Sequence, residues 1–166
     1  ATITEDLKAL ARKGRAAEEP VALHDVIDGA LMLLRSRFTG RLNRLAVAPF
    51  PADLRVLGNR LRLEQVLINL FQNALEAVET HSKGQVDVSV SVDGAMVTVI
   101  VADNGPGLSE AVLAQLFQPF NTSKDKGLGL GLVIAKDIVS DYGGSLEVET
   151  GAIGATFSTH LRKAEE

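Results

Sequence analysis

The chain has 166 residues, of which 46% are hydrophobic and 23% are charged, and its formal net charge is −4. This composition is typical of one globular domain, and the net negative charge argues against nucleic acid as the main partner. The absence of cysteine excludes a disulfide framework, a thiol nucleophile and a cysteine metal site, and it favours a cytoplasmic location.

The first third of the chain predicts two helices and two short strands. Residues 4–15 have a helix-forming composition that ends at Gly14 and at the Glu-Glu-Pro of 18–20. After Pro20, apolar residues recur at steps of three and four, which predicts an amphipathic helix ending near residues 38–40. Two short strands are then expected at 42–50 and 54–57, on either side of a turn that contains proline.

The strongest helical pattern of the chain covers residues 59–80, where one continuous apolar face is predicted. Alternating valines at 86–92, a turn at Asp93-Gly94 and a second apolar run at 96–101 predict a β-hairpin with one buried face.

The last third of the chain opens with a segment rich in glycine and proline, residues 103–128, which is expected to be a long loop with a short helix at 110–117. A helix is expected at 130–142, stopped by Gly143-Gly144, and two final strands at 145–150 and 155–161. The intermixed helices and hairpins predict an α+β fold, with a mixed sheet covered on one face by helices.

The predicted helix at 59–80 also has a polar face. An angular step of about 100° per residue places five polar side chains beside or opposite the apolar stripe: Gln65, Asn69, Gln72, Asn73 and Glu76. Asparagine is a poor residue for a helix interior, so the pair Asn69 and Asn73 suggests a coordinating role. An amide oxygen suits a Mg²⁺ ion that takes its other ligands from water and phosphates. The alternative is an ordinary solvated face.

Asp103, Gly105 and Gly107 follow the predicted second strand of the hairpin. Glycines allow a backbone to approach a flat ligand closely, and a carboxylate can accept a hydrogen bond from the exocyclic amine of adenine. The alternative is a simple turn, since Asn-Gly and Pro-Gly are common turn pairs.

A second glycine-rich run, residues 127–131, alternates glycine with leucine where a helix is expected to begin. Unpaired N–H groups at a helix start can bind phosphates, and the glycines would leave this backbone unobstructed. Lys124 and Lys126 lie just before the run and could add positive charge. A solvated loop is the alternative for both lysines.

Four ordered segments together resemble the conserved boxes of bacterial sensor histidine kinases: LEQVLINLFQNALEAV (63–78), DNGPG (103–107), LFQPFNTSK (116–124) and GLGLGL (127–132). These kinases belong to the GHKL superfamily, which shares the Bergerat fold with DNA gyrase B. The resemblance covers roughly residues 20–161. It implies a two-layer α/β sandwich with a flexible ATP lid, and Mg²⁺ and ATP as ligands.

The resemblance also implies individual roles. Asn73 would be the Mg²⁺ ligand and Asn69 its catalytic neighbour, while Asp103 would accept from the adenine amine, with Thr156 helping through a water. Gly105 and Gly107 would shape the base pocket, and Lys124 would reach a phosphate. The phosphates would be held by Gly127, Leu128, Gly129, Leu130 and Gly131, and Phe117 and Phe120 would pin the lid.

Two positions separate this chain from its superfamily relatives. The hydrolysing members carry a glutamate at the position of Asn69 to activate water, and an asparagine cannot take that proton. Glu76 stands where many kinases have a basic residue, which leaves a phosphate contact from this helix in doubt. The resemblance therefore favours phosphoryl transfer over hydrolysis, with a GHKL ATPase or a non-catalytic nucleotide-binding regulatory module as alternatives.

No phosphoacceptor histidine motif is found, because His24, His81 and His160 are each expected to be structural or solvated. Residues 1–16 are interpreted as the end of a dimerisation-domain helix or a linker, and 17–166 as the catalytic ATP-binding domain. The expected partners are ATP, the phosphoacceptor domain of the same kinase and, indirectly, a response regulator. The fragment is expected to be monomeric, within a homodimeric parent for which an anchor in the inner membrane is one alternative. The FNTSKDKGLGLGL run also resembles sensors that respond to nitrogen or to C4-dicarboxylates.

Overall fold

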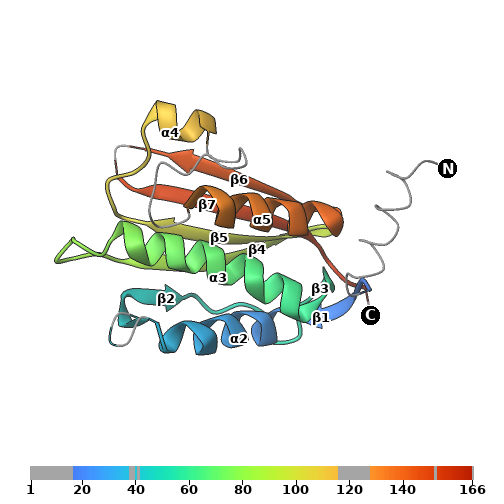
Figure 1. Ribbon diagram of the computed structural model, residues 1–166. Helices are drawn as coiled ribbons and strands as arrows, with labels where there is room; N and C mark the ends of the chain where they lie inside the picture. Colours follow the sequence, from blue (N-terminus) through green and yellow to red (C-terminus); the bar gives the residue numbers. More distant parts are fainter. Residues whose placement is uncertain (1–16, 38–39, 41, 116–127, 152, 166) are drawn as a thin grey trace.

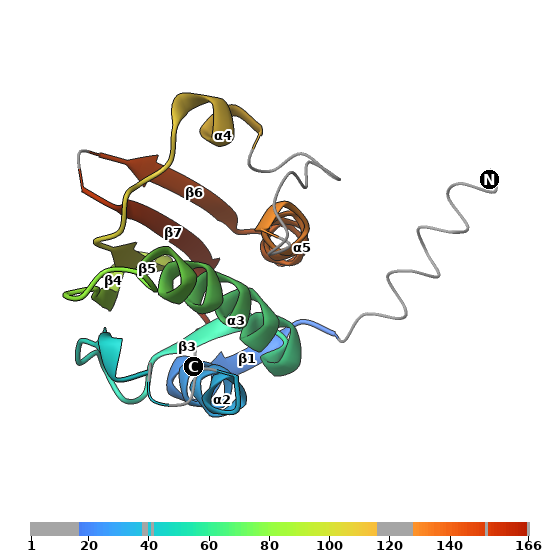
Figure 2. The same cartoon turned by 60° about the vertical axis from the view of Figure 1, so that its left-hand side comes forward.

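The computed structural model describes residues 17–37, 40, 42–115, 128–151 and 153–165. They form a five-stranded sheet with helices α3 and α5 against one face, and α2 lies beside α3 (Figures 1 and 2). The elements in chain order are β1 (Glu19–Ala22), α2 (Leu23–Arg35), the 3-10 helix η1 (Leu42–Arg44), β2 (Leu45–Val47), β3 (Arg55–Gly58), α3 (Arg60–Ala77), β4 (Val86–Asp93), β5 (Met96–Asp103), α4 (Glu110–Gln115), α5 (Leu128–Asp141), β6 (Ser145–Thr150) and β7 (Ala155–Arg162). The predicted α+β sandwich is confirmed.

The large sheet is mixed, with the strand order β2-β4-β5-β7-β6. β2 runs parallel to β4, whereas the other neighbouring strands are antiparallel. The predicted β-hairpin is confirmed as β4 and β5, in which Val86 pairs with Asp103 and Asp93 with Met96. This register brings Asp103 to the end of the sheet where α3 ends and β4 begins.

The structure differs from the sequence prediction around Pro20. Residues 19–22 form β1, which pairs antiparallel with β3 in a separate two-stranded sheet, so α2 begins only at Leu23. The predicted strand at 42–50 is divided into η1 and the short β2. Val21 is buried opposite Val56, and such a pairing between distant segments leaves no periodic signal in a local window.

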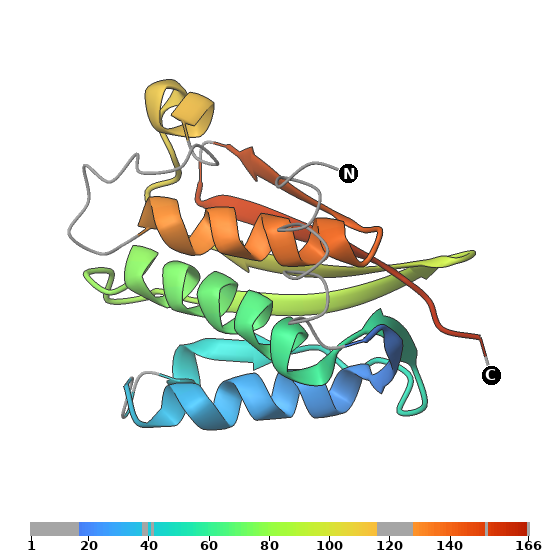
Figure 3. The ribbon, with the colours of Figure 1, turned by 45° about the vertical axis from the view of Figure 1, so that its right-hand side comes forward.

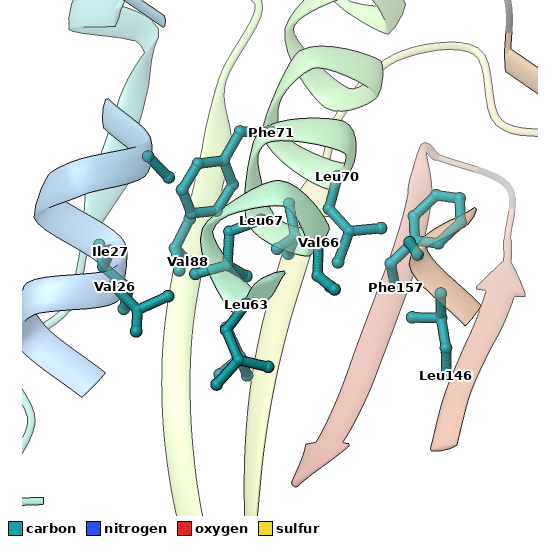
Figure 4. Close-up of a cluster of buried hydrophobic side chains, with 14 of the residues drawn as sticks. Val26, Ile27, Leu63, Val66, Leu67, Leu70, Phe71, Val88, Leu146 and Phe157 are labelled. Atoms are coloured by element: carbon teal, nitrogen blue, oxygen red, sulfur yellow. The ribbon is translucent and has the colours of Figure 1, made fainter. Parts of the chain in front are cut away.

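Helix α3 fulfils the prediction for residues 59–80. Asn59 caps its start, because its Oδ1 accepts a hydrogen bond from the backbone N–H of Arg62 at 3.1 Å. The apolar stripe of α3 is buried against the sheet and the neighbouring helices (Figure 4). Phe71, at its centre, is 0% exposed and is the largest of the fully buried side chains. The polar face of α3 is only partly covered, and Asn69, Asn73 and Glu76 on it are half-buried.

Helix α5 begins at Leu128, two residues before the predicted start, and ends at Asp141, just before Gly143-Gly144. Gly129 and Gly131 therefore belong to the first turn of the helix instead of preceding it. The first four N–H groups of any α-helix have no partner within that helix, so the binding of phosphates at the start of α5 remains a prediction. Figure 3 shows α5 and α3 side by side over the sheet. In the described part of the chain, no helix is long and apolar enough to cross a membrane.

Candidate functional site

The candidate site lies at the end of the sheet where β5 ends and the β6–β7 hairpin turns. Asp103 is the last residue of β5 and is 8% exposed. Its Oδ1 accepts hydrogen bonds from the backbone N–H groups of Gly105, at 2.9 Å, and Ala155, at 3.4 Å. Because both bonds use the same oxygen, the carboxylate is held in one orientation and Oδ2 remains the oxygen that can accept a donor from a ligand.

Burial raises the pKa of Asp103, because an ionised carboxylate is poorly solvated at this position. The hydrogen bonds from Gly105 and Ala155 and the nearby His81 act in the opposite direction and lower the pKa. Burial is the largest of these effects. A buried carboxylate with a raised pKa at the end of a central strand is typical of a functional site.

Two glycines keep the backbone close to Asp103. A Cβ at Gly105 would lie 2.6 Å from the carbonyl oxygen of Ala77, at the end of α3. Gly154 has a φ of +71° and packs directly against the backbone carbonyl of Asp103. A side chain at either position would therefore separate segments that now meet around Asp103.

Thr156 does not share this site, which corrects the prediction that it would help Asp103 to bind the base. Thr156 pairs with Ala102, and side chains alternate between the two faces along a strand, so Thr156 lies on the face opposite to Asp103. Ala155 contacts Asp103 instead, and it does so through its backbone N–H.

Of the two asparagines of α3, Asn69 contacts the beginning of α5. Asn69 Nδ2 donates a hydrogen bond to the backbone carbonyl of Gly131 at 2.9 Å, and this bond joins α3 to the first turn of α5. Asn73 Nδ2 is buried and has no hydrogen-bond partner within the described ranges. A buried Nδ2 without a partner is uncommon in a folded protein, and it fits a group that meets a ligand.

Glu76 is turned toward the α2 side of this polar face. Its Oε2 accepts a hydrogen bond from Gln72 Nε2 at 3.3 Å, and Gln72 Oε1 in turn accepts one from Arg37 Nη1 at 3.2 Å. Arg37 follows the C-terminal end of α2. The Glu76 carboxylate is therefore linked to the Arg37 guanidinium through the side-chain amide of Gln72.

The remaining predicted residues are only partly within the described structure. Lys124 and Gly127, and the lid residues Phe117 and Phe120, lie outside the described residues. Leu128, Gly129 and Leu130 are described as part of the first turn of α5, and their predicted contacts with phosphates remain predictions.

Sequence reasoning missed two residues that build the site. Asn104 accepts a hydrogen bond from the backbone N–H of Gln85 at 2.8 Å and donates one to the carbonyl of Lys83 at 3.0 Å, which fixes the loop after α3 to the end of β5. Thr150 Oγ1 accepts a hydrogen bond from the backbone N–H of Leu108 at 2.9 Å. The tendency of asparagine to bond to nearby backbone groups was a usable signal for Asn104, whereas nothing local marks Thr150.

Comparison with known proteins identifies the family of the chain. Residues 58–165 match the family described as histidine kinase-, DNA gyrase B-, and HSP90-like ATPase. The chain is 54% identical over 162 residues to the C4-dicarboxylate transport sensor protein DctB of Rhizobium meliloti, covering 98% of this chain and 26% of the relative. It is 36% identical to the sensor protein FixL of Bradyrhizobium diazoefficiens, covering 99% of this chain and 33% of that protein.

Among solved structures, the chain resembles the nucleotide-free catalytic domain of the histidine kinase ThkA, with a TM-score of 0.75 and 32% identity over 89% of this chain and 97% of that domain. It also resembles ThkA in complex with the response regulator protein TrrA, with a TM-score of 0.71 and 29% identity over 89% of this chain and 42% of that one. The chain thus spans about a quarter to a third of the curated relatives it matches and almost the whole of an isolated catalytic domain. It belongs to the family of histidine kinase-, DNA gyrase B- and HSP90-like ATPases, as the catalytic, ATP-binding domain of a sensor histidine kinase.

Proposed function

We propose that this domain binds Mg-ATP between α3 and α5 and presents the γ-phosphate to a histidine on a separate dimerisation domain of the same kinase. The observation that carries the proposal is the bond from Asn69 to the carbonyl of Gly131. This bond joins the polar face of α3, which also carries the unpartnered Nδ2 of Asn73, to the first turn of α5. The proposed metal ligand, Asn73, lies one helical turn after Asn69, which supports the proposal.

In the proposed complex, Asp103 Oδ2 accepts from the exocyclic amine of adenine while its Oδ1 stays bonded to the protein backbone. The free N–H groups in the first turn of α5 bind the phosphates. Asn73 Oδ1 would be the protein ligand of a Mg²⁺ ion, which would neutralise phosphate charge. Lys124 is proposed as a further phosphate contact.

The domain supplies positioning and charge stabilisation, which are the main requirements of phosphoryl transfer. Asn69 favours transfer over hydrolysis, because its amide cannot accept a proton from an attacking water. In addition, its Nδ2 is already bonded to Gly131. Hydrolysis of ATP by this domain alone is therefore expected to be slow.

The test is to incubate the domain with γ-labelled ATP and Mg²⁺, in the presence and absence of the dimerisation domain of its parent kinase. Label on a histidine of the added domain supports the proposal. Release of labelled phosphate without transfer would support a GHKL ATPase, and tight nucleotide binding with neither product would support a regulatory module. The variant Asn73→Ala serves as the control, because it should abolish the label while the protein remains folded.

We further propose that the parent protein is an inner-membrane-anchored sensor of C4-dicarboxylates, which passes its phosphoryl group to a response regulator and acts as a homodimer. The proposal is supported by the 54% identity to a C4-dicarboxylate transport sensor and by the structural similarity to a histidine kinase crystallised with its response regulator. Autophosphorylation of the full-length parent in membranes should change when succinate is added. No change with any C4-dicarboxylate would refute this assignment.

A further inference from the structure

Thr150, the last residue of β6, connects two segments that are distant in the sequence. Its Oγ1 accepts a hydrogen bond from the backbone N–H of Leu108 at 2.9 Å. The same hydroxyl donates to the carbonyl of Gly154 at 3.3 Å. One hydroxyl group therefore links the loop that follows β5 to the hairpin between β6 and β7.

These two segments are the ones that hold Asp103. The loop contributes the N–H of Gly105, and the hairpin contributes the N–H of Ala155, the residue directly after Gly154. The loop also packs tightly on the threonine, since a Cβ at Gly107 would lie 2.9 Å from Thr150 Oγ1. If the link through Thr150 were lost, the two N–H donors could move independently and Asp103 Oδ1 would no longer be fixed.

We propose that Thr150 is a positioning residue for the nucleotide site, which sets the affinity for the adenine base by fixing the orientation of the Asp103 carboxylate. This inference rests on the proposed role of Asp103 in binding adenine. Thr150 itself does not need to touch the nucleotide. Its hydroxyl is required because it must both accept and donate, and serine can meet this requirement whereas valine cannot.

The test compares Thr150→Val, which keeps the shape of the side chain, with Thr150→Ser, which keeps the hydroxyl. Dissociation constants for ATP and ADP are measured by calorimetry on the whole chain. The valine variant should bind both nucleotides about tenfold more weakly, as expected when one partly buried hydrogen-bonded contact is lost. The serine variant should bind almost as tightly as the wild type. The loss should be equal for ATP and ADP, because it arises at the base and not at the phosphates.

Thr98→Val is the matched control. Thr98 also lies on a strand and also makes a side-chain hydrogen bond, to His160 Nδ1 at 2.8 Å, but it lies on the face of the sheet opposite to Asp103. Its removal should leave nucleotide affinity unchanged. In the free protein, the Leu108 amide should exchange with solvent faster in Thr150→Val than in the wild type, whereas the amides of the central strand β5 should not change.

The possible outcomes separate this inference from the proposed function. If Thr150→Val binds like the wild type while Asp103→Asn does not bind, the role of Thr150 is refuted and the adenine site stands. If Asp103→Asn binds like the wild type, the proposed adenine site itself fails. Equal losses in the valine and serine variants would also refute the inference, because the hydroxyl would then not matter. Should Thr150→Val not fold, Thr150→Ala must show the same weakened binding.

Discussion

Gly154→Ala is the substitution whose effect can be worked out most directly from the structure. Gly154 has a φ of +71°, a region in which a residue with a Cβ is strained. The added methyl group would also occupy the space of the Asp103 carbonyl oxygen. The substitution therefore combines a conformational cost with a steric overlap.

The two costs can be separated with Gly94→Ala. Gly94 lies in the turn between β4 and β5 with a φ of +62°, but nothing lies within 4 Å of a Cβ built on it. Its replacement should lower the free energy of unfolding by about 1 kcal/mol, the cost of a left-handed backbone alone. Gly154→Ala should lower it by about 3 kcal/mol, because the overlap with a rigid backbone adds roughly 1–3 kcal/mol.

Urea unfolding followed by circular dichroism measures both values, and calorimetry measures ATP binding under conditions in which both variants are folded. Gly154→Ala should bind ATP much more weakly than the wild type, since the overlap displaces the end of β5 that carries Asp103. Gly94→Ala should bind normally, because its turn joins the opposite ends of β4 and β5. Equal destabilisation by the two substitutions would refute the reasoning, as would normal ATP binding by Gly154→Ala.

Three further outcomes are expected. Asn73→Ala should remove Mg²⁺-dependent ATP binding and change the free energy of unfolding by less than about 1 kcal/mol, because Asn73 Nδ2 has no partner in the described part of the fold; a large stability loss by urea unfolding would contradict this. Phe71→Ala should cost about 3–5 kcal/mol in the same assay, since Phe71 is 0% exposed. Asp103→Asn should be more stable than the wild type at neutral pH, because the raised pKa of Asp103 means that its ionised form lowers stability. This gain in the free energy of unfolding should disappear as the pH falls through the raised pKa of Asp103 and below 3.8, the ordinary pKa of an aspartate. A difference in unfolding free energy between the two proteins that stays constant with pH would contradict the prediction.

The parts of the fold that the sequence predicted best are those whose signal is local. Helix α3 was predicted because its buried face repeats at a helical period, and the structure adds that Asn59 caps its start. The hairpin of β4 and β5 was predicted because alternating valines flank an Asp-Gly turn. In both cases the residues that determine the element lie within the element itself.

The parts that were missed depend on contacts between distant segments. β1 exists because residues 19–22 pair with β3, and a short run after a proline carries no sign of that partner. Thr156 was assigned to the Asp103 site because the prediction did not consider that side chains alternate between the two faces of the sheet along β7. Ala155 and Phe157 are buried on one face, and Thr156 lies on the other. Thr150 was overlooked for the same reason, since its two partners lie in the 104–109 loop and the β6–β7 turn.

The Asp103 site also connects stability to ligand binding. Burial makes the ionised carboxylate unfavourable, and the backbone bonds to Oδ1 offset this only in part, so the pKa of Asp103 remains raised. A ligand amine that donates to Oδ2 stabilises the ionised form and must lower this pKa. By linkage, ATP should bind more tightly above the raised pKa than below it, and binding near that pKa should release a proton. In the protein without ligand, the buried ionised carboxylate of Asp103 lowers stability, and a ligand amine bonded to Oδ2 would remove part of this cost. Asp103→Asn is therefore expected both to stabilise the free protein and to weaken ATP binding.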